Sequence, residues 1–217
     1  MSTERASVAE QFEEPAQQRE AATLGMWVFL ATEILFFGGM FLGYTVYRFY
    51  YPQVFAEASN HTLILFGSVN TAVLLVSSFV MVLAVRAAER RERLETSGLL
   101  ALTALLGLVF LVIKGVEYYH EIQEGLLPGP HFRFEGADPA IAKMFFYLYF
   151  LMTGVHALHV TIGVVLIGLL AARVLISSRP GRLSTTVDLL GLYWHFVDII
   201  WVFLFPLIYL VGRHTHT

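Results

Sequence analysis

The run GLLALTALLGLVFLVIKGVEY, residues 98–118, is apolar over almost its whole length and is long enough to cross a lipid bilayer. A transmembrane helix needs about 20 such residues to cross a hydrocarbon core that is about 30 Å thick. Four further apolar runs lie at about residues 24–47, 62–85, 140–172 and 189–211. The sequence therefore predicts an all-α, polytopic membrane protein built as a bundle of five transmembrane helices.

The composition agrees with a membrane protein and excludes several other classes. Hydrophobic residues make up 57% of the 217 residues, charged residues 14%, and the mean hydropathy is +0.66. Cysteine is absent, which excludes disulfides, iron–sulfur clusters and thiolate zinc sites. A net charge of −3 without a basic face argues against nucleic acid as a partner. We expect a polar tail over residues 1–23, one five-helix domain over 24–212, and a short tail over 213–217.

The distribution of lysine and arginine predicts the orientation, because loops rich in them tend to remain in the cytoplasm. The side of the N-terminus would hold Arg5, Arg19, Arg86, Arg90, Arg91, Arg93, Arg173, Arg179 and Arg182. The opposite side would hold Arg48, Arg133, Lys143 and Arg213. We therefore expect a cytoplasmic N-terminus and, after five crossings, a C-terminus on the outer, periplasmic side.

Ionisable side chains inside the apolar runs are the candidates for function, because burying them in a bilayer is costly. They are Glu33, Lys114, Glu117, His156, His159, His195 and Asp198. Residues three apart share one face of a helix. Together with His120, the set therefore forms three such pairs, Glu117/His120, His156/His159 and His195/Asp198.

A metal site is one interpretation of these pairs, and a structural polar network is the other. The chain lacks the two Glu-x-x-His motifs and two further glutamates of a di-iron carboxylate bundle, and it lacks the HExxH of zincins. Haem ligation by His195 and one histidine of the fourth run stays open, as does a membrane metalloenzyme. An ion or proton transporter using Glu33 and the Lys114/Glu117 pair is a further alternative.

The structural interpretation lets these groups satisfy one another by hydrogen bonds across helices, each worth about 1 kcal/mol. Lys114 and Glu117 are spaced to form an ion pair. The rise along each helix predicts two layers. The inner layer holds Glu33, His159, His195 and Asp198, and the outer layer holds Lys114, Glu117 and His156.

Small residues predict where helices approach one another closely. They are Gly38, Gly39 and Gly43 in the first run, and Gly154, Gly163 and Gly168 in the fourth.

Five motifs follow one another in the order of a known family. They are GMWVFLATEILFFGGMF (25–41), SVNTAVLLVSS (68–78), GVEYYHEI (115–122), TGVHALHVTIG (153–163) and LYWHFVDIIWVFLFPLIYL (192–210). In this order they resemble the signatures of subunit III of haem–copper respiratory oxidases. The chain resembles the short, five-helix bacterial form of cytochrome c oxidase subunit III, which lacks the two-helix arm of the full-length form.

This resemblance implies a non-catalytic subunit of an O2-reducing, proton-translocating complex in the bacterial inner (plasma) membrane. The chain would hold no redox centre or other cofactor of its own, with the haems and copper in partner subunits. Subunit I would be its direct partner, beside subunit II and, left open, further small subunits or a respiratory supercomplex. Its roles would be to bind phospholipid and to support proton uptake and turnover stability.

The resemblance also implies roles for single residues. Glu33 matches the buried, carbodiimide-reactive glutamate of the family, and Arg173 matches a basic residue that pairs with a phospholipid head group. Glu33 together with YWHFVDIIW favours a cytochrome c oxidase over a quinol oxidase or the accessory subunit of a nitric oxide reductase. The expected lipid-binding set is Glu33, His159 and Arg173. The expected structural polar network is Lys114, Glu117, His156, His195 and Asp198, without a metal.

Overall fold

Five long helices dominate the computed structural model, which describes residues 12, 14–136, 138–177 and 183–214. They are α2 (Pro15–Tyr50), α4 (Ile64–Glu89), α5 (Arg93–Gln123), α6 (Pro139–Ile176) and α7 (Ser184–Tyr209). Each is long and apolar enough to cross a membrane. These helices confirm the predicted all-α, five-span fold and show a multi-pass membrane protein. Arg5, Arg179 and Arg182, and most of the predicted tails, lie outside the described residues.

Two of the five long helices begin at a proline, which fits the first helical turn because its missing N–H needs no partner there. α2 begins at Pro15, so residues 15–23 of the expected polar tail are helical. α6 begins at Pro139, and the Asp138 carboxylate caps it by accepting hydrogen bonds from the backbone N–H of Ala140 and Ile141 at 3.1 and 3.2 Å. With 38 residues, α6 is roughly 57 Å long and exceeds the thickness of a bilayer.

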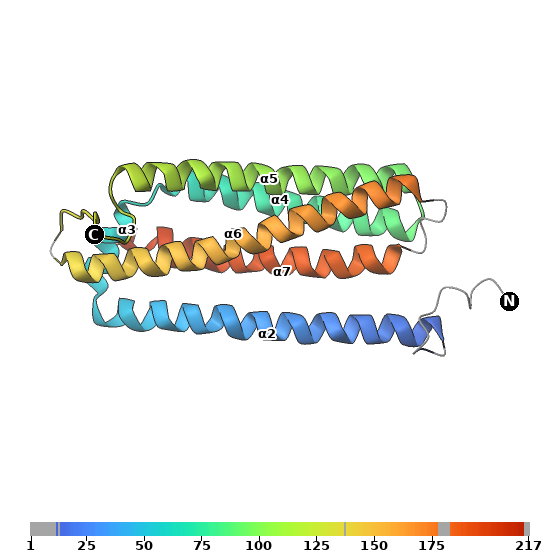
Figure 1. The fold of residues 1–217 in the computed structure, drawn as a ribbon, viewed down its shortest axis with the longest axis horizontal. Coiled ribbons are helices and arrows are strands. Elements are labelled where there is room, and N and C mark those ends of the chain that lie inside the picture. Colours follow the sequence, from blue (N-terminus) through green and yellow to red (C-terminus); the bar gives the residue numbers. More distant parts are fainter. Residues whose placement is uncertain (1–11, 13, 137, 178–182, 215–217) are drawn as a thin grey trace.

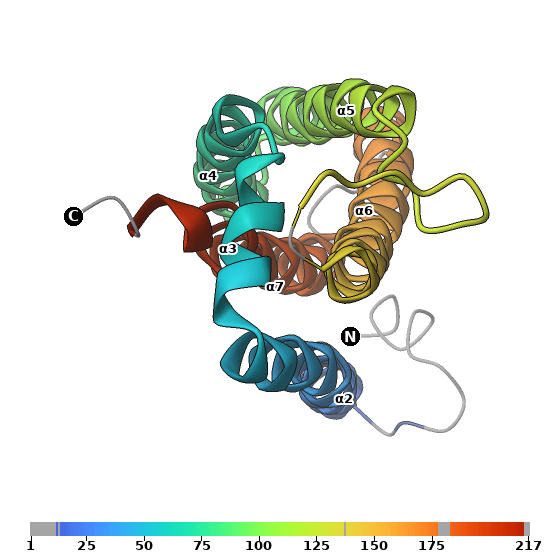
Figure 2. The same ribbon diagram turned by 90° about the vertical axis from the view of Figure 1, so that its left-hand side faces the viewer.

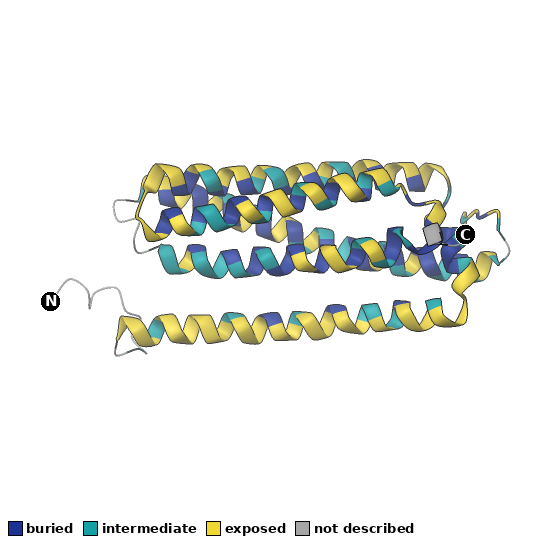
Figure 3. Cartoon of the chain, turned by 180° about the vertical axis from the view of Figure 1, so that it is seen from behind, coloured by how far each residue is buried: buried dark blue, intermediate teal, exposed yellow. Residues whose placement is uncertain are grey.

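The helices form a four-helix bundle with one helix at its side. Figures 1 and 2 show α4, α5, α6 and α7 around a common core, with α2 next to α6 and α7. Within the most apolar 18-residue window of each helix, 11% of the residues of α2 are buried, compared with 56% of the residues of α7. Figure 3 shows α2 exposed along most of its length. Within the described chain, α2 therefore packs against the bundle mainly through one face of the helix.

Glycines bring three helices together around one tryptophan. Trp194 of α7 lies between Gly107 of α5 and Gly163 of α6, where an added Cβ would approach its ring to 2.6 and 2.7 Å. Its indole Nε1 donates a hydrogen bond to Ser77 Oγ of α4 at 3.1 Å. The helices can meet this closely because neither glycine has a side chain.

Four of the six predicted glycines make no close contact within the described chain. Within the described chain, no atom of a neighbouring element lies within 4 Å of a Cβ built on Gly38, Gly39, Gly43 or Gly168. A Cβ on Gly154 would meet the Tyr118 hydroxyl at an ordinary 3.7 Å. Gly38 lines the apolar groove between α2 and α7, so a small residue there leaves open space instead of a close helix contact.

A short helix, α3 (Pro52–Asn60), and a 3₁₀ turn, η2 (Val211–His214), close the end of the bundle opposite the start of α2 (Figure 2). The Ser59 hydroxyl donates a hydrogen bond to the Ile208 carbonyl at 2.7 Å. A Cβ on Gly212 would collide with the Ala56 carbonyl oxygen and the Asn60 side chain. The C-terminal segment is thereby fixed against the connection between the first two spans.

Candidate functional site

A buried ion pair with two tyrosines lies near the C-terminal end of α5. Lys114 Nζ is 3.1 Å from Glu117 Oε2, so the ion pair predicted from their spacing is present. The ammonium also donates hydrogen bonds of 2.7 Å to the hydroxyls of Tyr149 and Tyr209. These hydroxyls in turn donate to Glu117 Oε1, at 3.0 Å from Tyr149 and 2.6 Å from Tyr209. Lys114 is 2% exposed, so these contacts take the place of water.

Three helices build this cluster. Lys114 and Glu117 point inward from α5, while Tyr149 comes from α6 and Tyr209 from the end of α7. The ammonium also lies 4.6 Å from the centre of the Tyr149 ring and 5.7 Å from that of Trp201, within range of cation–π attraction. Sequence spacing did not indicate the two tyrosines as partners, because they lie far from Lys114 and Glu117 along the chain.

A second polar pair joins α2 to α6. Glu33 Oε2 is 3.1 Å from His159 Nε2, and His159 Nδ1 is 2.9 Å from the Val155 carbonyl oxygen. A carbonyl can only accept, so Nδ1 is the donor. The contact between His159 Nε2 and the Glu33 carboxyl group is then a hydrogen bond if one of the two groups carries a proton. Glu33 is 18% exposed in its side chain and is therefore partly buried, not enclosed.

The two histidines of TGVHALHVTIG face different neighbours. His156 is fully buried against Phe110 of α5 and Trp201 of α7, with ring centres 5.5 and 5.2 Å apart. His159 points to α2. The two side chains therefore do not converge on one ligand, and the described residues contain no group of three His, Asp or Glu side chains placed to hold a metal ion.

The other two pairs predicted at a spacing of three also do not form. His195 Nδ1 lies 2.7 Å from the Ser78 hydroxyl of α4, and Asp198 is buried one turn further along α7. His120 is exposed and lies beside Phe66, with ring centres 6.5 Å apart. Contacts between helices replace the expected contacts within one helix.

Arg173 lies in a different place from Glu33 and His159. Fourteen residues separate it from His159 on α6, which corresponds to roughly 21 Å of helix. The expected lipid-binding set is thus divided between two positions.

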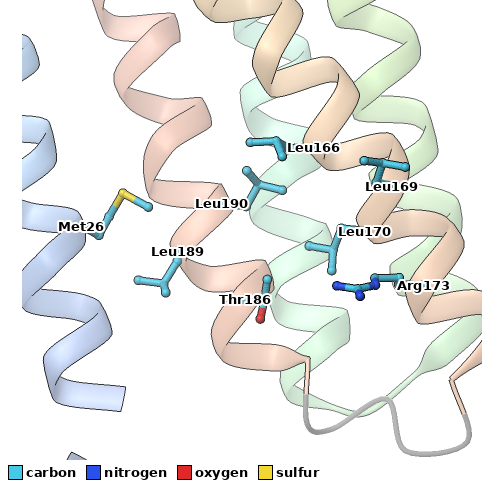
Figure 4. Close-up of a pocket in the computed structure, with 8 residues that line it drawn as sticks. All are labelled: Met26, Leu166, Leu169, Leu170, Arg173, Thr186, Leu189 and Leu190. Atoms are coloured by element: carbon cyan, nitrogen blue, oxygen red, sulfur yellow. The ribbon is translucent and has the colours of Figure 1, made fainter. Parts of the chain in front are cut away.

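A groove of about 530 Å³ between α2, α6 and α7 contains Arg173. Its other lining residues are Met26, Leu166, Leu169, Leu170, Thr186, Leu189 and Leu190. Figure 4 shows Arg173 near the end of α6, with its guanidinium group directed toward α7 and the leucines further along the groove. A second apolar groove of about 490 Å³ lies between α2 and α7. The space beside α2 is therefore apolar, with Arg173 at one end.

Comparison with known proteins identifies the family. Residues 13–213 match the sequence profile described as cytochrome c oxidase subunit III. The chain belongs to the cytochrome c oxidase subunit III family. The match confirms the resemblance that the five motifs indicated, and it covers all five spans.

Subunit III proteins of several oxidases are similar to the chain. Cytochrome c oxidase subunit 3 of Synechocystis sp. is 33% identical over 191 residues, covering 86% of this chain and 74% of the relative. Cytochrome bo(3) ubiquinol oxidase subunit 3 of Pseudomonas aeruginosa is 29% identical, covering 87% and 84%. A protein of Aeropyrum pernix named heme-copper oxidase subunit I+III is 33% identical over 86% of this chain and 22% of the relative.

Proposed function

We propose that this chain is the non-catalytic subunit III of a cytochrome c oxidase in a bacterial inner membrane. In this proposal it packs on subunit I, which with the other partner subunits holds the haems and copper, and it supports proton uptake and turnover stability. Membership of the subunit III family supports the assignment to an oxidase. The Aeropyrum relative, whose name joins subunits I and III, supports subunit I as the direct partner.

Phospholipid is the proposed ligand of the groove beside α2, and the groove itself is the observation that carries this role. Leucines line most of its wall, and Arg173 supplies a positive charge near one end. Acyl chains fit the apolar wall, while a guanidinium group binds a phosphate with two parallel hydrogen bonds. Glu33 and His159 lie further along the same side of the bundle and would contact the lipid chains, not the head group.

Native mass spectrometry of the purified complex tests the lipid. Arg173→Ala is expected to lose one phospholipid adduct relative to the wild type. Arg90→Ala is the matched control, because Arg90 is exposed and, among the described residues, forms ion pairs with Glu92 and Glu95 away from the groove. A complete set of adducts in Arg173→Ala would remove the proposed head-group contact.

The electron donor separates the preferred assignment from its alternative, a quinol oxidase, which the Pseudomonas relative supports. Purification of the native complex is expected to yield a haem–copper subunit I that oxidises reduced cytochrome c. Oxidation of quinol alone would favour the alternative, and a preparation without a haem–copper subunit would contradict both.

A further inference from the structure

Glu121 is a buried acidic residue to which neither the sequence nor the proposed function gives a role. It is 1% exposed, and neither of its carboxyl oxygens has a hydrogen-bond partner among the described residues. It follows Glu117 by four residues and Lys114 by seven, so all three lie on one face of α5. That face therefore directs one basic and two acidic side chains into the same buried region.

The charges of this region do not balance if both acids are ionised. Lys114 and Glu117 neutralise each other across 3.1 Å, which leaves an ionised Glu121 as one uncompensated negative charge. The tyrosines that face the cluster, Tyr118, Tyr149 and Tyr209, add no positive charge.

Among the described residues, Lys114 is the cation that acts on Glu121. On α6, which packs on α5, Lys143 donates to the Gly129 carbonyl at 3.0 Å and His156 lies within range of Lys114. Its charged neighbours besides Lys114 are Glu117 on its own helix and the exposed Glu124 directly after that helix, which are both acidic. α4, which also packs on α5, has no titratable side chain from Ile64 to Val85. An uncompensated charge buried in this way is strongly destabilising.

The hydrogen bonds show which carboxyl group is the charged one. Glu117 Oε1 accepts from both tyrosine hydroxyls and Oε2 faces the ammonium, so Glu117 has the contacts of a carboxylate. The Tyr149 hydroxyl lies beside Glu121 but donates to Glu117, and neither oxygen of Glu121 accepts a hydrogen bond from the described chain. A metal ion is a poor candidate for balancing Glu121, because the Lys114 ammonium already occupies the position beside Glu117 that a cation would take.

We propose that Lys114, Glu117 and Glu121 form a buried proton-binding site in which Glu121 holds one proton. The site then contains one ammonium, one carboxylate and one neutral carboxylic acid, and its net charge is zero. This inference concerns the interior of the chain and does not depend on which oxidase contains it.

Infrared difference spectroscopy on the purified native complex tests the site. A carboxylic acid has a carbonyl band separate from the carboxylate bands, and this band shifts in D2O. The spectrum of the wild type minus Glu121→Gln is expected to contain one carboxylic-acid band. Glu124→Gln is the matched control, because this exposed residue three positions further on should contribute carboxylate bands only.

Glu117→Gln provides a second and less obvious readout. Without Glu117, Glu121 becomes the only counterion of Lys114 and is expected to release its proton. The spectrum of the wild type minus Glu117→Gln should therefore also contain a carboxylic-acid band, although the residue removed was a carboxylate. Carboxylate bands without a carboxylic-acid band in the Glu121→Gln difference spectrum would overturn the proposal. If Glu121→Gln does not assemble, the same result in the Glu117→Gln difference spectrum would overturn it.

Discussion

Two buried tyrosines differ in what their hydroxyl groups contact. The Tyr209 hydroxyl joins Lys114 to Glu117, whereas the Tyr44 hydroxyl has no hydrogen-bond partner in the described part of the chain. Tyr209→Phe is expected to destabilise the subunit by about 1–3 kcal/mol, because it leaves buried charged groups without a partner. Tyr44→Phe is expected to be neutral or slightly stabilising. Thermal unfolding midpoints of the purified complexes compare the two, and equal midpoints would contradict the assigned hydrogen bonds.

Two glycines of α5 give a second test at this scale. Gly107→Ala would place a Cβ 2.6 Å from the Trp194 ring and from Val164, so we expect a loss of about 1–3 kcal/mol from overpacking. At Gly115 no atom of a neighbouring element in the described chain lies within 4 Å. Gly115→Ala should therefore stabilise the helix by roughly 0.5–1 kcal/mol. Thermal midpoints that shift in the same direction for both variants would contradict this difference in packing.

Helical spacing predicts neighbours on one helix but not the partners on another. The Lys114–Glu117 pair could be predicted because a spacing of three fixes its geometry. Tyr149 and Tyr209 could not, because the rotation and register of α6 and α7 decide which side chains reach α5. His156 and His159 differ by only about 60° around α6, yet this angle directs one to the core and the other to α2. Glu121 did carry a signal, since it shares the face of Lys114 and Glu117.

At the scale of helices, α2 is the least buried of the five spans. Glu33 contacts His159 at 3.1 Å and forms a polar link between α2 and α6. We expect Glu33→Gln to raise amide hydrogen exchange in α2 while exchange in α5 and α7 stays unchanged, because local opening follows the contacts that are lost. Glu89→Gln at the end of α4 is the control. Exchange that rises equally in all helices would indicate a general loss of stability instead.

Hydropathy was enough to predict the five spans, but not the elements between them. Each long helix needs a continuous apolar run, which is visible in the sequence. α3 has nine residues and η2 has four, and both are held by contacts with distant segments, such as that of Ser59 with Ile208. Their short lengths leave no periodic signal, so only the folded chain defines them.

The whole molecule is asymmetric in charge between its two ends. Among the described residues, Arg19, Arg86, Arg90, Arg91, Arg93 and Arg173 lie toward the end where α2 begins. Arg48, Arg133 and Lys143 lie toward the other end. The orientation stays a prediction, with the more basic end in the cytoplasm.

Cysteine labelling can test this orientation, since the chain has no cysteine of its own. In right-side-out vesicles, whose periplasmic surface faces the medium, a membrane-impermeant maleimide is expected to label His131→Cys and to spare Arg90→Cys. Both positions are exposed in the structure, so accessibility within the chain does not bias the comparison. Inverted vesicles should give the reverse pattern, and labelling of Arg90→Cys in the first preparation would contradict the orientation.

The contact between α3 and η2 also has a consequence for biosynthesis. A ribosome makes α2 and α3 before the residues from Ile208 onward, yet the Ser59 hydroxyl binds the Ile208 carbonyl and Gly212 lies against Ala56. The connection between the first two spans therefore reaches its final contacts only after α7 and η2 have been made. Until then this closure is missing, so the first of the five spans to be made is among the last to be fixed in place.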